Sequence, residues 1–296
     1  MQILFPCDLI GNLMALQYDA AMGRLAPRVP KRTWVGLIAV VVVVAINVGL
    51  GNLLAIGIPG ADVTLKFAVS HFIPLPITII VALLFLRWAR WGRDVWAETP
   101  TLKLRPARRW LIAIPALLTM SAVLQVAEIP WADRTALFVL VIVVGTALVG
   151  FNEELYVRGI LLTAARGRHG ELYALTISAG VFAIAHLPIS LINGFPAYAI
   201  GLQIGALLVG GVGCYWVRRV TGRLWAAIAV HALTDCVLYL GSDFTDSPNH
   251  HRSPVDLDIL GVPVEVALWV MCVISIVSVA REDRRRRDSQ HHELSL

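Results

Sequence analysis

Charged side chains are scarce in this sequence. Only 15% of its 296 residues are Asp, Glu, Lys or Arg, whereas 57% are hydrophobic. An average soluble domain carries roughly 25% charged residues. The uncharged stretches form apolar runs of about 20 residues, the length of a helix that crosses the hydrocarbon core of a bilayer. This composition excludes a soluble domain and predicts an all-α, polytopic integral membrane protein.

Cysteine is also rare, and two common motifs are absent. The four cysteines lie at positions 7, 214, 236 and 272 without any C-x-x-C pair, so they predict neither a disulfide framework nor a thiolate metal site. The sequence contains no H-E-x-x-H motif, which excludes a zincin-type metalloprotease. Residues 1–33 hold no apolar run of the kind found in a signal peptide.

The apolar runs predict about eight transmembrane helices and no separate soluble domain. The expected organisation is a cytoplasmic N-terminal segment (1–33), a transmembrane domain (34–281) whose motif core covers about 135–241, and a basic cytoplasmic tail (282–296). The predicted spans lie near 34–56, 67–88, 109–128, 135–165, 171–190, 196–217, 223–241 and 259–280.

Basic residues mark every second connection between the predicted spans. They precede the first span, follow the second, fourth and sixth, and fill the tail, while the alternate connections contain few of them. The positive-inside rule therefore places both termini in the cytoplasm. The net charge of +5 is spread over five membrane-edge segments, which disfavours a nucleic-acid-binding patch. The bilayer is the expected partner, and the Arg- and Ala-rich composition, typical of a high-GC bacterium, predicts a bacterial plasma membrane.

Ionisable residues inside the predicted spans are the candidates for function. Such groups cost at least a few kcal/mol each at membrane depth, so they are rare unless a site requires them. Three clusters lie on three different spans: Glu153, Glu154 and Arg158; His186, preceded four residues earlier by Phe182; and His231, followed four residues later by Asp235.

The depths of these residues predict that the clusters meet. At about 1.5 Å per helical residue, Glu153 lies roughly 20 Å and His186 roughly 22 Å from the cytoplasmic ends of their spans. On the same scale, His231 is roughly 12 Å deep and Asp235 roughly 18 Å. All four residues therefore fall in one layer near the middle of the bilayer, where three helices can place them around a shared cavity.

Helical spacing separates the two adjacent acids. Glu154 and Arg158 are four residues apart, so they share a helix face and are expected to pair and to hold the span in place. Glu153 is turned by about 100° from Glu154 and is left free for other partners. His231 and Asp235 also share a face, so the carboxylate can orient the imidazole or contribute an oxygen to the site.

The three motifs resemble those of a known family. They read EELYVR (153–158), FAIAH (182–186) and HALTD (231–235), and in this order they are similar to the CPBP family of intramembrane proteases. That family includes the CAAX prenyl endopeptidases and bacterial Abi-type proteins. The resemblance covers roughly 150–240 and implies a helical membrane fold and hydrolysis of a membrane-associated peptide or protein. The third motif ends in Asp235, where CAAX-processing members typically have Asn, so the resemblance leaves the substrate class open.

Peptide hydrolysis assigns a role to each residue of the layer. The reaction needs a nucleophilic water, a proton shuttle and groups that stabilise the oxyanion. We expect Glu153 to be the general base and His186 to hold or activate the water. His231 and Asp235 would then flank the tetrahedral intermediate.

Zn²⁺ is an open alternative for water activation. Glu153, His186 and His231 together match a catalytic zinc set that leaves one coordination position open. A metal-free scheme, in which Glu153 and His186 activate water directly, fits the same residues equally well and is slightly preferred.

Two other classes of function remain open. Buried acids and histidines also build transporters and proton relays, although the sequence has neither paired interrupted helices nor matching halves. A non-catalytic membrane partner or immunity-type protein on the same scaffold is the other alternative.

The remaining polar and small residues of the spans have structural interpretations. His71 has no polar companions in sequence and is expected to be structural. Gly201 and Gly205 form a G-x-x-x-G pattern, which is typical of close helix packing. The glycines at 210, 211 and 213 either pack in the same way or leave room for a substrate.

The charge pattern generates a topology prediction. Reporter fusions at Arg93 and at Asp256 should report opposite sides of the membrane, with Arg93 in the cytoplasm, because basic connections stay inside. A paired alkaline phosphatase and fluorescent-protein fusion at each position measures the side. The eight-span arrangement would be wrong if both positions reported the same compartment.

Overall fold

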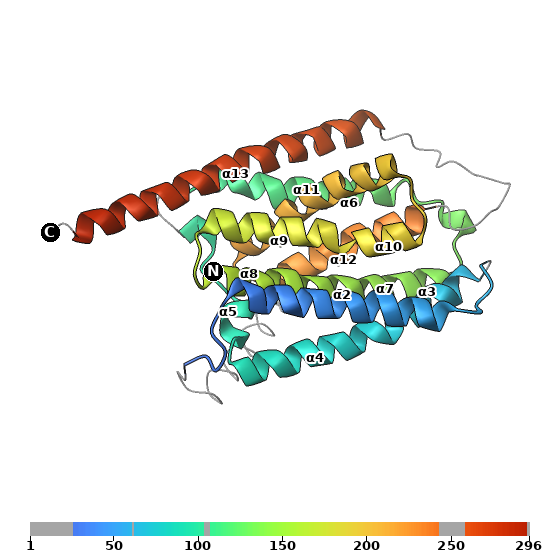
Figure 1. The fold of residues 1–296 in the computed structure, drawn as a ribbon. Coiled ribbons are helices and arrows are strands. Elements are labelled where there is room, and N and C mark those ends of the chain that lie inside the picture. Colours follow the sequence, from blue (N-terminus) through green and yellow to red (C-terminus); the bar gives the residue numbers. More distant parts are fainter. Residues whose placement is uncertain (1–25, 61, 104–106, 243–257, 295–296) are drawn as a thin grey trace, which may run out of the picture.

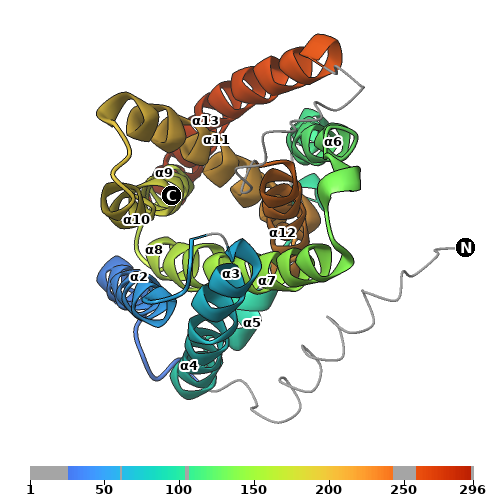
Figure 2. The ribbon, with the colours of Figure 1, turned by 90° about the vertical axis from the view of Figure 1, so that its right-hand side faces the viewer.

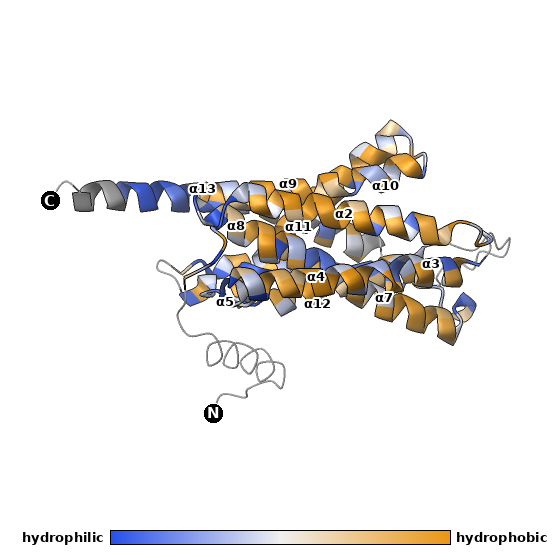
Figure 3. Ribbon diagram, turned by 60° about the horizontal axis from the view of Figure 1, so that its bottom comes forward, coloured by the Kyte–Doolittle hydropathy of each residue, from blue (hydrophilic) through white to orange (hydrophobic). Residues whose placement is uncertain are grey.

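The structure is a computed structural model that describes residues 26–60, 62–103, 107–242 and 258–294. Within these ranges the chain is a bundle of helices, and its β-structure is limited to an isolated bridge between Ala97 and Arg223. Eight helices are long and apolar enough to cross a membrane, and their apolar middles are seen in Figure 3. The predicted all-α polytopic class is confirmed. Most of the predicted N-terminal segment lies outside the described residues.

The helices are numbered along the chain as in Figure 1. Their bounds are α2 Thr33–Ala55, α3 Val63–Phe72, α4 Pro74–Ala89, α5 Gly92–Trp96, η1 Thr101–Lys103, η2 Arg109–Ile112, α6 Ala113–Val126, η3 Trp131–Asp133, α7 Ala136–Glu154, η4 Leu155–Leu161, α8 Leu162–Arg166, α9 Glu171–Ala185, α10 Leu187–Ile192, α11 Ala197–Thr221, α12 Leu224–Gly241 and α13 Asp258–Leu294.

Proline breaks two of the spans. The span from Val63 to Ala89 divides into α3 and α4 at Ile73, directly before Pro74. The span from Glu171 to Ile192 divides into α9 and α10 at His186, two residues before Pro188. Proline has no backbone N–H, and its ring clashes with the carbonyl four residues earlier, so the preceding turn opens. His186 therefore lies at a break in its span and not within a regular helix.

The fourth span changes its helical type directly after the paired acids. It runs as one element from Ala136 to Arg166, but its middle part, η4, is a π-helix. Short π-helical segments are rare and often occur at functional sites. Here the π-helix contains Arg158, and all of its residues are buried.

The last helix is longer than the predicted span. It was expected to end near residue 280, but α13 continues without interruption to Leu294. Its Asp283 accepts hydrogen bonds from the backbone N–H groups of Glu171 and Leu172, each at 2.9 Å. Because Gly170 at the N-cap of α9 has no side chain to cap the helix, Asp283 satisfies these N–H groups from another helix. The predicted tail therefore begins within α13, and its residues 284–288 are exposed.

The helices enclose a central group formed by α7, α9, α11 and α12 (Figure 2). α3 and α4 pack against α7, α2 packs against η4 and α8, and α6 packs against α11, α12 and α13. The motif residues come from α7, η4, α9 and α12, with His186 at the junction of α9 and α10.

Close helix packing occurs at Gly211 and Gly213, which is one of the two alternatives predicted for them, and not at Gly201 and Gly205. A Cβ added at Gly201 would meet no atom of the described residues within 4 Å, and one at Gly205 would meet only Trp269. The G-x-x-x-G prediction is therefore wrong. On the same helix, Gly211 and Gly213 do pack closely, because a Cβ would lie 3.1 Å from Ala179 Cα and 2.9 Å from a Leu118 methyl group, respectively.

Gly150 sets the distance between α7 and α12. A Cβ at this position would lie 2.9 Å from the backbone N of Ala232 and 3.0 Å from the backbone O of Ile228. Such contacts are shorter than real Cβ atoms tolerate, so any larger residue must push the two backbones apart.

We expect Gly150→Ala to destabilise the protein by about 1–3 kcal/mol through overpacking. Gly201→Ala is the matched control, since open space surrounds that position and alanine is the better helix former. Thermal unfolding of both variants in detergent measures the difference. Equal melting temperatures for the two variants would contradict the close crossing of α7 and α12.

Candidate active site

Glu154 and Arg158 form a completely buried ion pair. Both side chains are fully buried, and Arg158 Nη1 donates to Glu154 Oε1 at 2.8 Å. The guanidinium also donates from Nη2 to the backbone O of Gly211 at 3.0 Å and stacks over the Phe182 ring at 4.3 Å. The pair that the spacing predicts is formed, and it fixes η4 against α9 and α11.

His231 also bonds Glu154, a contact that the spacing did not indicate. Its Nδ1 lies 2.8 Å from Glu154 Oε1, and because a carboxylate oxygen accepts hydrogen bonds, Nδ1–H is the donor. The contact joins α12 to α7 next to the Gly150 crossing. It also fixes the orientation of the imidazole ring, so His231 Nε2 faces Glu153 Oε2 at 3.7 Å and Asp235 Oδ2 at 3.4 Å.

His186 is oriented by its own backbone. Its Nδ1 lies 2.9 Å from the carbonyl O of Phe182, so Nδ1–H donates there and Nε2 is left facing Glu153 Oε2 at 3.9 Å. The Phe182 ring packs edge-on against both imidazoles, with centroids 5.1 Å from His186 and 5.5 Å from His231. The F-x-x-x-H spacing thus supplies both the carbonyl that holds the imidazole and the ring that supports it.

The two adjacent acids have different environments. The Glu154 side chain is fully buried, whereas the side chains of Glu153, His186 and Asp235 remain 29%, 26% and 21% exposed. Glu153 Oε2 approaches both imidazole Nε2 atoms at distances too long for a direct hydrogen bond. One small molecule such as water can bridge these gaps. Glu153, His186, His231 and Asp235 of the predicted layer therefore lie together, and three of these four side chains are partly exposed.

The same donors fit a metal ion. With the Nδ1–H of each imidazole committed to an oxygen acceptor, both Nε2 atoms carry a free lone pair in the neutral form, as in metal-binding histidines whose second nitrogen is hydrogen-bonded. The Glu153 carboxylate supplies a third ligand. Glu153, His186 and His231 would hold Zn²⁺, which would supply Lewis-acid activation of water.

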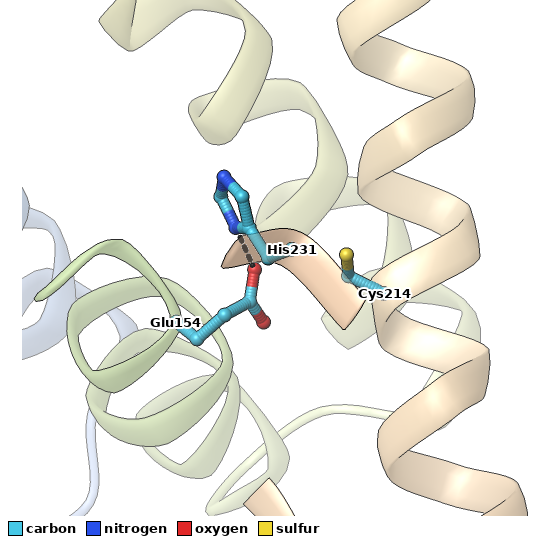
Figure 4. A group of neighbouring side chains, drawn as sticks. All are labelled: Glu154, Cys214 and His231. Atoms are coloured by element: carbon cyan, nitrogen blue, oxygen red, sulfur yellow. Dashed lines mark hydrogen bonds and ion pairs between the residues drawn. The ribbon is translucent and has the colours of Figure 1, made fainter. Parts of the chain in front are cut away.

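A second group of possible metal ligands lies on the other side of His231. Ligand atoms of Glu154, Cys214 and His231 lie within 4.8 Å of one another (Figure 4). Glu154 Oε1 and His231 Nδ1 already bond each other, and Arg158 contacts the same oxygen. A cation there would compete with a guanidinium, so we interpret the group as a hydrogen-bonded support of His231. Sequence reasoning did not connect Cys214 with the site, because no motif includes it.

A polar cluster that sequence reasoning missed joins α7 and η4 to α2 and α4 next to Glu153. Asn152 Nδ2 donates to Thr78 Oγ1 at 2.7 Å, and Asn47 Nδ2 donates to Asn152 Oδ1 at 3.0 Å. The Tyr156 hydroxyl donates to the backbone O of Thr78 at 2.9 Å. Asn152 and Tyr156 share a helix face, and their bonds to α2 and α4 fix the rotation of α7 that turns Glu153 inward. An asparagine within an apolar span was the available signal.

His71 contacts mainly its own turn of α3. Its Nδ1 lies 2.9 Å from the backbone O of Phe67, and its ring stacks on the Phe67 ring at 4.0 Å. These contacts agree with the structural interpretation of this residue.

Comparison with known proteins agrees with the motifs. Residues 135–237 match the model of a family described as Rce1-like, Type II CAAX prenyl endopeptidase Rce1-like. The matched region contains all three motifs and every residue of the site described above except Asn47 and Thr78. No curated protein matches the chain, and no solved structure matches it either. The resemblance to the CPBP and CAAX proteases is confirmed.

The buried pair generates a prediction on stability. Glu154→Gln leaves Arg158 without its charge partner in a fully buried position, and breaking one side of a buried pair costs about 3–5 kcal/mol. We expect lower thermal stability and lower yield in detergent. Glu153→Gln is the matched control and should stay near wild type, because the adjacent acid is partly exposed.

The double variant Glu154→Gln with Arg158→Met tests the cause. It should recover part of the stability, because no unpaired charge remains in the protein interior. The ion pair would not be the stabilising feature if the double variant unfolded at a lower temperature than Glu154→Gln alone.

Proposed function

We propose that this chain, whose residues 135–237 belong to the Rce1-like CAAX protease family, is an intramembrane endopeptidase. Its substrate would be a membrane-associated protein or peptide, and Glu153 and His186 would activate the hydrolytic water. The observation that carries the proposal is the position of Glu153 Oε2, within 3.9 Å of the Nε2 atoms of both His186 and His231. We also propose a bacterial plasma membrane location with both termini in the cytoplasm, from the distribution of basic residues.

The roles follow from the position of each group. A water among Glu153 Oε2 and the two Nε2 atoms would give a proton to the carboxylate as its oxygen attacks the carbonyl carbon of the scissile peptide. Glu153 would pass this proton to the leaving nitrogen when the C–N bond breaks. His231 and Asp235 lie on one side of Glu153 and would flank the tetrahedral intermediate. Glu154 and Arg158 would position His231 without contacting the substrate.

Metal dependence is part of the proposal. The residues fit Zn²⁺, which would supply Lewis-acid chemistry when bound, and they equally fit direct activation of water by carboxylate and imidazole. We prefer the metal-free scheme, because Glu153 alone can be the base and the imidazoles can hold the water by hydrogen bonds.

Cleavage of a membrane peptide library by the purified protein tests the function. We expect Glu153→Gln to abolish cleavage, a loss of at least about 100-fold for removal of a general base, with stability near wild type. Glu128→Gln is the matched control, an exposed acid in a connection, and should cleave like wild type. Treatment with a chelator should leave the wild-type rate unchanged; loss that Zn²⁺ but not Ca²⁺ restores would reverse the metal-free preference.

Two results would contradict the proposed function. Equal cleavage by wild type and Glu153→Gln would rule out the carboxylate-activated water. Absence of cleavage by the folded wild-type protein would favour a non-catalytic membrane partner on the same fold.

A further inference from the structure

The pattern that carries His186 occurs a second time in the chain. Residues 67–71 read FAVSH and residues 182–186 read FAIAH, so each element places a histidine four residues after a phenylalanine. Both histidines also lie at the end of a helix, where a span is broken: His71 in the last turn of α3, and His186 at the C-cap of α9. The function proposed above uses only the second of these elements.

The first element orients its imidazole as the second one does. His71 Nδ1 lies 2.9 Å from the backbone O of Phe67, and Ser70 Oγ lies 2.9 Å from the same nitrogen. His186 Nδ1 lies 2.9 Å from the backbone O of Phe182. Because a carbonyl oxygen only accepts hydrogen bonds, Nδ1–H is the donor in both histidines. In both, Nε2 is therefore the nitrogen that is left for other partners.

Phe67 fixes α3 against α7 and α12. α3 lies beside α7 (Figure 2), and Gly145 of α7 makes room for the Phe67 ring, because a Cβ at this position would overlap the ring. The same ring packs edge-on against Tyr239 of α12, with centroids 5.1 Å apart, and it stacks on the His71 ring at 4.0 Å. His71 is thus held next to this part of α12.

Tyr239 shares a face of α12 with two residues of the site. It lies one turn beyond Asp235, which in turn lies one turn beyond His231. The charge of Asp235 acts on His71 as well as on Tyr239, so the imidazole of α3 and the carboxylate of α12 lie near each other. His71 is only partly buried, and within the described part of the chain its hydrogen bonds are all made by Nδ1.

Imidazoles and carboxylates therefore alternate along one row of the site. Glu153 Oε2 lies 3.9 Å from His186 Nε2 and 3.7 Å from His231 Nε2. His231 Nε2 lies 3.4 Å from Asp235 Oδ2, so two carboxylates, whose like charges repel each other, face one nitrogen. With His71 next to Asp235, each of these two carboxylates has an imidazole on both sides.

We propose that His71 is a positioning residue of the active site, and that it acts through Asp235. Its imidazole attracts the Asp235 carboxylate toward α3, so His231 Nε2 stays available to Glu153 and to the reacting groups. The contacts of His71 with its own turn are then the means by which its ring is oriented, as they are for His186. The effect on cleavage rests on the proposed function, whereas the interaction between His71 and Asp235 does not.

A double-mutant cycle on cleavage distinguishes this role from a structural one. We expect His71→Gln to lower kcat on the order of 10-fold, as for coupled residues of one network, and to change KM less. In Asp235→Asn, where the charge is already removed, adding His71→Gln should change kcat by less than about 2-fold. His169→Gln, which removes an exposed imidazole, is the matched control and should cleave like wild type.

His71→Phe tests whether the aromatic ring alone is sufficient. It keeps a ring against Phe67 and removes both nitrogens, so we expect it to lose kcat as His71→Gln does, with a melting temperature near wild type. Wild-type cleavage by His71→Phe or by His71→Gln would overturn the proposal. An equal loss from His71→Gln in the wild-type and Asp235→Asn backgrounds would also overturn it, because the effect would then not pass through Asp235.

Histidine NMR tests the interaction without hydrolysis. In protein isotope-labelled at the histidine Cε1 carbon, the His71 signal is identified by its loss in His71→Gln. We expect this signal to move in Asp235→Asn and to keep its position in Asp133→Asn, which removes an exposed acid of a connection. An unmoved His71 signal in folded Asp235→Asn would overturn the proposal and leave the peptidase activity unaffected. A protein that fails the cleavage test can still pass this one.

Discussion

Glu154 Oε1 is the atom on which the arrangement of the site depends. It accepts a hydrogen bond from Arg158 and another from His231, each at 2.8 Å, and so joins the π-helix to α12. The carboxylate is fully buried, where an unpaired charge would be very costly, so the two donors are required for the fold as well as for the site. Because Arg158 also reaches the backbone of α11, one ion pair fixes three elements relative to one another.

The two adjacent glutamates have different roles because they point in directions about 100° apart around the helix. One supports the structure, and the other is placed for chemistry. Glu154 faces the protein interior and accepts two hydrogen bonds at Oε1, while Glu153 is partly exposed and forms no direct hydrogen bond to the imidazoles near it. A group that is to accept a proton from water must keep an oxygen available for it. Asn152, on the opposite side, bonds Thr78 and Asn47 and keeps α7 from rotating these two acids out of their places.

Ion pairs hold together the end of the bundle next to η4 and α8. Arg166 pairs there with Glu98 and Glu171, and every residue from 154 to 165 of the fourth span is buried. This packed region gives the site a rigid support, because residues that are tightly packed and hydrogen-bonded hold their rotamers.

The sequence by itself determined the membrane class, the span count, the motif layer and the pairing of Glu154 with Arg158. These features depend on composition and on contacts within one helix, which local periodicity encodes. Only the tertiary structure decided the bond from Glu154 to His231, the cap that Asp283 provides for α9, the Asn152 cluster and the failure of Gly201 to pack. Each of these features depends on how separate helices lie relative to one another. The crossing distances and rotations that decide this arise from packing. Helical spacing could place Glu153 and Glu154 on different faces, but the neighbouring helices decided which face became the interior.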